Sequence, residues 1–144
     1  MTDPTIIRTL QTLYEAEHRC PTIRLEQSAP FINWRGAAEE VTLRGLATDD
    51  REHLEWLAEM LVERDSAPPP AGYAIHSAGQ HYVRLDSLLP QWVRSERNLI
   101  AAYQQAAPRL AGDADASRRV ARIMSRHGAH LATLESLERA AATA

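Results

Sequence analysis

Apolar residues recur every three or four positions along four stretches of the chain, and this spacing places side chains on one face of an α-helix. The stretches run from about 4 to 20, 34 to 64, 80 to 107 and 117 to 139. Polar residues occupy most of the positions between the apolar ones, so each helix is expected to bury one stripe and expose the rest. The pattern predicts an all-α protein with four amphipathic helices.

Proline and glycine mark where these helices are expected to end or weaken. Pro21 cannot donate a backbone hydrogen bond, so it should end or kink the first helix, and Pro90 should kink the third. Gly45 weakens the middle of the second helix, and Thr48 with the acids after it could cap a shorter helix there. The spacing favours one long helix, and the shorter one remains an alternative.

Two connections differ greatly in length. A turn is expected around Ala29 and Pro30, whereas residues 65–80, DSAPPPAGYAIHSAGQ, contain three consecutive prolines and two glycines and predict a long irregular connection. A short turn makes consecutive helices antiparallel neighbours, while a long connection can start the third helix at the opposite end. We therefore predict an antiparallel four-helix bundle with a long crossover between its second and third helices.

Length and composition set the class of the protein. A chain of 144 residues with 44% apolar residues and a net charge of −3 is expected to form one domain over residues 1–144. The 16 positive charges are all arginine and are mixed with 19 acids, so no nucleic-acid partner is expected. The lack of lysine excludes Schiff-base chemistry by this chain.

The cellular setting is inferred from what the sequence contains. Cys20 is the only cysteine, so no intrachain disulfide can form. The start MTDPTIIRTL lacks the pattern of a signal peptide, and no apolar run reaches the length of a membrane span. A cytoplasmic protein with no membrane partner is expected.

Six ionisable residues interrupt the apolar stripes, and all four helices contribute. Burying such groups without partners costs several kcal/mol, so they usually pair, stay neutral or bind a metal. Residues three apart on a helix point the same way, so each of the two pairs in this set can aim two side chains at one centre. Three carboxylates and three imidazoles are thereby candidate metal ligands: Glu17, Asp50, His53, Glu96, His127 and His130.

This arrangement resembles the ferritin-like superfamily, which includes bacterioferritins and rubrerythrins, over nearly the whole chain. That family has a glutamate on the first helix, ExxH on the second, a glutamate on the third and ExxH on the fourth, and binds two iron or manganese ions. The first glutamate falls on Glu17 in LYEAEHR, with Glu15 as its nearest rival, and the third-helix glutamate falls on Glu96 in SERNLIAAY. The two ExxH motifs fall on 50–53 and 127–130.

Both ExxH motifs depart from the family pattern. Asp50 is shorter than the expected glutamate, and His127 stands where a bridging glutamate is expected. A carboxylate can link two metals with its two oxygens, whereas a neutral imidazole normally reaches one. With these ligands the site could hold two ions loosely, hold one, prefer zinc, or hold none.

The resemblance implies a dinuclear centre, with iron as the expected metal and manganese or zinc as alternatives. It further implies redox chemistry with a small-molecule oxidant, oxygen or peroxide, in an oxidoreductase that forms a homo-oligomer, expected to be a dimer. The alternative is a metal-free ferritin-like domain that binds a partner or regulates through its surface.

The candidate ligands also have ordinary structural interpretations, and Glu17 in YEAEHR could belong to an exposed acidic face. Asp50 could be a helix-start acid favoured by the helix dipole, and Glu96 could be solvated within the charged run RSER. His127 and His130 could form a polar pair at a bundle edge or a dimer interface. The coincidence of six such residues in four stripes favours the metal hypothesis.

Overall fold

The structure is a computed structural model that describes residues 2–25, 32–70 and 83–142. Its described part contains four long helices, two short 3₁₀ helices and two strands of two residues each. In chain order they are α1 Pro4–His18, η1 Pro21–Arg24, β1 Ile32–Asn33, α3 Ala37–Glu63, β2 Val83–Arg84, α4 Leu85–Ala106, η4 Ala107–Leu110 and α5 Ala114–Ala142. The predicted all-α class is confirmed.

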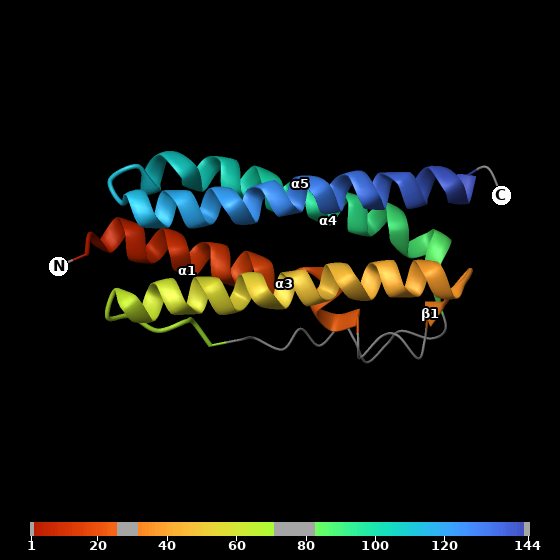
Figure 1. Ribbon diagram of the computed structural model, residues 1–144, viewed down its shortest axis with the longest axis horizontal. Coiled ribbons are helices and arrows are strands. Elements are labelled where there is room, and N and C mark those ends of the chain that lie inside the picture. Colours follow the sequence, from red (N-terminus) through yellow and green to blue (C-terminus); the bar gives the residue numbers. More distant parts are fainter. Residues whose placement is uncertain (1, 26–31, 71–82, 143–144) are drawn as a thin grey trace.

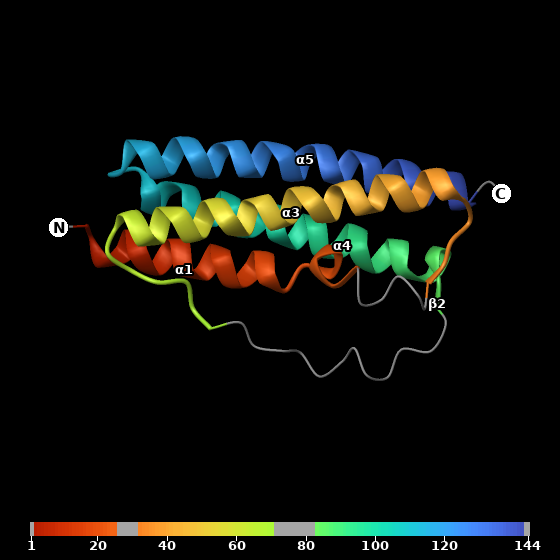
Figure 2. The same cartoon turned by 60° about the horizontal axis from the view of Figure 1, so that its bottom comes forward.

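The four long helices lie side by side as a bundle, with α1 packed against α3 and α4 packed against α5 (Figures 1 and 2). The strands β1 and β2 pair in parallel, with Ile32 opposite Val83 and Asn33 opposite Arg84. Since β1 precedes α3 and β2 precedes α4, these two helices start at the same end and run in the same direction. The predicted long crossover between the second and third long helices is thus confirmed. Its residues 71–82 and the turn expected at Ala29 and Pro30 lie outside the described residues.

The first two helices begin and end largely where the sequence predicts. Asp3 caps α1 by accepting a hydrogen bond from the backbone N–H of Thr5 at 2.8 Å, and α1 ends before Pro21, which opens η1. Helix α3 continues through Gly45, and Thr48 donates its hydroxyl to the carbonyl of Arg44 at 3.1 Å instead of capping a new helix. The interpretation as one long helix is therefore correct.

The starts of the last two helices differ from the sequence-based expectation. Helix α4 begins at Leu85 rather than near residue 80, because Val83 and Arg84 form the strand β2. Helix α5 begins at Ala114 rather than at 117, because Asp113 caps it by accepting from the N–H of Ala116 at 3.0 Å.

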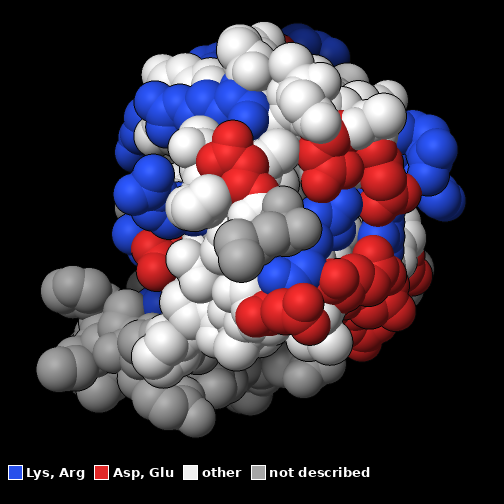
Figure 3. Space-filling model, turned by 90° about the vertical axis from the view of Figure 1, so that its left-hand side faces the viewer, with Lys and Arg blue, Asp and Glu red and all other residues white. Residues whose placement is uncertain are grey.

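The bundle end that holds the α4–α5 turn is tied together by ion pairs. Arg64, just after α3, donates to both oxygens of Asp113 at 2.9 and 3.0 Å. Arg119 on α5 reaches Glu59 and Glu63 of α3 at 3.1 and 2.9 Å. In the end view of Figure 3, acidic and basic side chains adjoin one another. Acidic and basic residues are therefore interspersed at this end of the bundle.

The buried apolar residues form two clusters along the bundle. One contains Leu10, Leu57 and Ile123, and the other contains Leu43 and Leu134, each with further residues of the same helices. Along α3, α4 and α5 the ionisable residues of the stripes fall between the members of these two clusters. A layer of polar side chains therefore separates two apolar halves of the core.

Candidate metal centre

The structure brings the six candidate ligands together inside the bundle. None has more than 4% of its surface exposed, and all four long helices contribute at least one. They are Glu17 from α1, Asp50 and His53 from α3, Glu96 from α4, and His127 and His130 from α5. Below, they are called the six-residue cluster.

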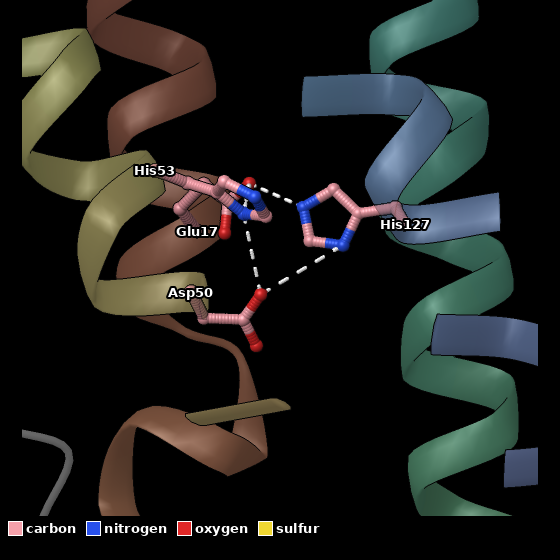
Figure 4. Close-up of side chains that lie close together, drawn as sticks. All are labelled: Glu17, Asp50, His53 and His127. Carbon is pink, nitrogen blue, oxygen red and sulfur yellow. Dashed lines mark hydrogen bonds and ion pairs between the residues drawn. The ribbon is translucent and has the colours of Figure 1, made fainter. Parts of the chain in front are cut away.

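Four members of the cluster point toward one another across the space between α1, α3 and α5 (Figure 4). One donor atom each from Glu17, Asp50, His53 and His127 lies within 4.8 Å of all the others. His53 Nδ1 is 3.4 Å from Oε1 of Glu17 and 3.3 Å from Oδ1 of Asp50, and His127 Nε2 contacts the same Glu17 oxygen. These four residues form the first half-site.

The second half-site lies on the other side of the His127 ring. Nδ1 of His127 is 2.5 Å from Oε1 of Glu96, and Nδ1 of His130 is 3.7 Å from the same oxygen. Donor atoms of these three residues also lie within 4.8 Å of one another. The other nitrogen of His130 lies 2.9 Å from Oδ2 of Asp49, a partly exposed carboxylate that also pairs with Arg126. His127 is therefore common to both half-sites.

Asp50 lies between the half-sites and uses its two oxygens differently. Oδ1 faces the imidazoles, at 3.3 Å from His53 Nδ1 and 3.6 Å from His130 Nδ1. Oδ2 accepts from the hydroxyl of Thr22 and from the thiol of Cys20, the latter at 3.6 Å. Thr22 belongs to η1, so the short helix opened by Pro21 supports a carboxylate of α3.

Three residues around the cluster were not predicted to act there. Tyr103 donates its hydroxyl to Oε1 of Glu17 at 2.6 Å. Tyr103 follows Glu96 by seven residues, two helical turns, and this spacing could have indicated a shared face. Cys20 similarly follows Glu17 by three residues. No sequence pattern marks Thr22.

Burial and pairing oppose each other in setting the charges of the cluster. Burial alone would raise the pKa of Glu17, but pairing with His127 and His53 outweighs it and lowers that pKa from 4.5 to about 2. Burial would lower the pKa of His127, but Glu17 and Glu96 together raise it to about 10. Burial would also lower the pKa of His53, but its pairing with Asp50 and Glu17 outweighs burial and raises that pKa. In the metal-free protein Glu17 is therefore ionised and His127 protonated at neutral pH.

The neighbouring thiol and phenol remain protonated. Burial, reinforced by the charge of Asp50, raises the pKa of the Cys20 thiol well above its usual value. Burial and the charge of Glu17 raise the pKa of the Tyr103 hydroxyl in the same way. Both groups act as hydrogen-bond donors to carboxylates of the cluster.

Several buried atoms of the cluster have no hydrogen-bond partner among the described residues. They are Glu17 Oε2, Asp50 Oδ1, both ring nitrogens of His53, and His130 Nδ1. Buried polar atoms are rarely left unpaired, because each costs about 1–3 kcal/mol. Carboxylate oxygens and imidazole nitrogens are ligands of iron, manganese and zinc, so the unpaired atoms fit a bound cation.

Comparison with known proteins identifies solved structures that share this fold. No protein-family model and no curated protein matches the chain. A solved structure of ferritin-like, diiron-carboxylate proteins from Bacillus anthracis superposes with a TM-score of 0.75 at 15% identity, covering 95% of this chain and 99% of that one. Dps from Staphylococcus aureus gives a TM-score of 0.74 at 12% identity, covering 92% and 94% of the two chains.

The chain has the ferritin-like fold. Bacterioferritin from Desulfovibrio desulfuricans is a further ferritin-like neighbour, with a TM-score of 0.71 at 19% identity, covering 93% of this chain and 78% of that one. None of the described helices of this ferritin-like bundle has the length and apolar composition of a membrane span. The two unusual residues, Asp50 and His127, belong to the first half-site, and both also contact residues of the second.

Proposed function

We propose that this ferritin-like protein binds iron at the six-residue cluster and uses it in redox chemistry with oxygen or peroxide. The observation that carries the proposal is the set of buried carboxylate and imidazole atoms with no hydrogen-bond partner among the described residues. A cluster evolved only for packing would leave few such atoms, since each destabilises the fold. A cation bound between them would remove that cost.

The choice of iron rests on the structural neighbours together with the donor atoms. The Bacillus anthracis structure is named for diiron-carboxylate proteins, and the bacterioferritin structure for a diiron site in different catalytic states. The donor set here, three carboxylates and three imidazoles, suits iron, and it also accepts manganese and zinc. Iron is the metal that both the names of the structural neighbours and the donor atoms support.

The protein residues would hold the metal and control its surroundings. Bound iron would supply electrons to the oxidant, while the carboxylates of Glu17 and Asp50 would balance its charge. The two apolar clusters on either side of the polar layer keep bulk water away from it. Tyr103 and Thr22 hold the two carboxylates by hydrogen bonds, which keeps their remaining oxygens directed at the site.

Elemental mass spectrometry of tag-free protein, grown with iron, manganese and zinc available, tests the binding. We expect iron at one or more ions per chain and its loss in His53→Ala. His18→Ala is the matched control, because His18 lies on α1 outside the cluster, with its ring tilted against that of Tyr14. The control should keep the metal content of the natural protein.

Oxidation of ferrous protein by oxygen or by hydrogen peroxide, followed by absorbance, tests the chemistry. We expect oxidation faster than that of the same iron in buffer, and no acceleration in His53→Ala. Bound iron that oxidises no faster than free iron would contradict the redox part of the proposal. Stoichiometric zinc with no iron would contradict the choice of metal.

One observation favours the metal-free alternative. His127 pairs with Glu17 and with Glu96, so part of the cluster neutralises its own charges without a cation. Under this alternative the protein would purify folded with almost no metal and act through its surface. Light scattering that shows a stable dimer of such metal-free protein would support it.

A further inference from the structure

The two half-sites share the imidazole of His127, and this shared ring limits how many ions the cluster can hold. Nε2 of His127 faces Glu17 in the first half-site, and Nδ1 contacts Glu96 in the second at 2.5 Å, closer than its 3.9 Å distance to Oδ1 of Asp50 (Figure 4). A neutral imidazole has one nitrogen with a lone pair and one that carries a proton. His127 can therefore ligate a metal in one half-site only, and it presents an N–H to the other.

The lone pair of His127 is more useful to a metal ion in the first half-site than to one in the second. The first half-site contains three further ligands, Glu17, Asp50 and His53, and four of their buried atoms have no hydrogen-bond partner among the described residues. In the second half-site only Nδ1 of His130 is unpaired in this sense. An ion in the first half-site would therefore satisfy more buried atoms than an ion in the second.

If His127 ligates the metal through Nε2, Glu96 has a different role. With Nε2 on the metal, the proton of His127 resides on Nδ1, which lies 2.5 Å from Oε1 of Glu96. A carboxylate that accepts from the far nitrogen of a ligating histidine fixes the ring orientation and raises its basicity. Glu96 then acts as a positioning residue rather than as a ligand.

Little remains in the second half-site to hold an ion. With Nδ1 of His127 engaged with Oε1 of Glu96, the second half-site keeps His130 and the other oxygen of Glu96. The Nε2 atom of His130 is held by Asp49 at 2.9 Å, which leaves Nδ1 as a single donor. Zinc sites use three or four protein ligands, so one imidazole with one carboxylate oxygen is not enough.

We propose that the chain holds one metal ion, ligated by Glu17, Asp50, His53 and Nε2 of His127, instead of the two ions that its fold would suggest. The inference rests on the proposed metal binding and specifies its stoichiometry and ligands. It assigns Glu96 to the positioning of His127, and it leaves His130 outside the ligand set.

Calorimetric titration of the metal-free full-length protein tests this assignment, with ferrous iron under anaerobic conditions and separately with zinc. We expect one ion per chain for both metals. His53→Ala should weaken binding by more than about 100-fold, and Glu96→Gln by about 10- to 100-fold, the usual effect of losing an outer partner. His130→Ala is the matched comparison, also a buried histidine of the cluster, and should weaken binding by less than about tenfold.

A second variant tests the reason for the single ion. In His127→Glu the new carboxylate can offer one oxygen to each half-site, so the stoichiometry should rise from one ion to two. Circular dichroism would show that the variant keeps its helices. A stoichiometry that stays at one in folded His127→Glu would overturn the role assigned to the imidazole.

The outcomes separate this inference from the proposed function. Two ions of similar affinity in the natural protein, or equal losses in His53→Ala and His130→Ala, would overturn the single-ion site while metal binding itself stands. Failure of the natural protein to bind either metal would instead refute the proposed function, and the single-ion site with it.

Discussion

The hydroxyl of Thr22 donates to Oδ2 of Asp50, so only Oδ1 of that carboxylate faces the imidazoles of the cluster. The two residues are 28 positions apart, and Thr22 lies in the short helix η1 that follows α1. The chain segment that breaks the first helix thus positions a side chain of the buried polar layer. Both residues are buried, so water cannot replace this bond.

We expect Thr22→Val to reduce both stability and metal affinity. Loss of the hydroxyl leaves Oδ2 of Asp50 short of a donor, which should lower the free energy of unfolding by about 1–3 kcal/mol. Freed rotation of Asp50 should weaken metal binding by about 10- to 100-fold. Urea unfolding and metal titration measure the two effects. Thr22→Ser keeps the hydroxyl and is the control, and equal losses in both variants would show that the methyl group matters instead.

Tyr103→Phe should destabilise the protein because it removes the hydroxyl that donates to Glu17 at 2.6 Å. A buried carboxylate that loses a donor costs about 1–3 kcal/mol. Tyr14→Phe serves as the control, since Tyr14 is half-buried and no hydrogen bond of its hydroxyl is seen among the described residues; its effect should stay within about 0.5 kcal/mol. Thermal unfolding of both variants decides the matter, and similar midpoints would argue against the bond.

The stability of the metal-free protein should depend on pH in two separate ranges. The pKa of Glu17 is lowered from 4.5 to about 2 in the folded state, so its contribution is present above pH 4.5 and is lost as the pH falls toward 2. The pKa of His127 is raised from 6.5 to about 10, so its contribution is present below pH 6.5 and is lost as the pH rises toward 10. The contributions of these two groups are therefore both complete between pH 4.5 and 6.5.

Urea unfolding in the presence of a chelator, repeated from pH 3 to pH 10, measures this dependence. The alkaline decrease should become smaller in His127→Gln, which keeps a polar side chain but cannot gain a proton, and His53, whose pKa is also raised, should account for the remainder. A natural protein whose free energy of unfolding stays constant between pH 6.5 and 10 would contradict the pairing of His127 with the two carboxylates.

Gly45→Ala should stabilise the protein by about 0.5–1 kcal/mol. Gly45 lies on the exposed side of α3, and a Cβ atom there would meet nothing within 4 Å. Alanine loses less backbone entropy than glycine in a helix. Thermal unfolding measures the gain, and an unchanged or lower midpoint would indicate that α3 bends or breaks at this position.

The fold was largely predictable because it depends on spacing along the chain. Steps of three and four between apolar residues determined four helices, and Pro21 and the proline-rich segment determined where the chain leaves them. The starts of the helices were less predictable. Helix α4 begins after the strand β2, which pairs with β1, and α5 begins where Asp113 accepts from the N–H of Ala116. Pairing between distant residues and the choice among several possible caps leave no periodic signal.

The membership of the six-residue cluster was also visible in the sequence, because ionisable residues at stripe positions must share the core that the stripes build. The contacts that these residues make were not visible in the sequence. That Thr22, Cys20 and Tyr103 support the carboxylates, and that the two nitrogens of His127 face different half-sites, follows from the packing of α1, α3, α4 and α5 against one another. A sequence assigns a side chain to a face of its own helix, whereas the direction of each donor atom is set by the neighbouring helices, and only the tertiary structure decides that.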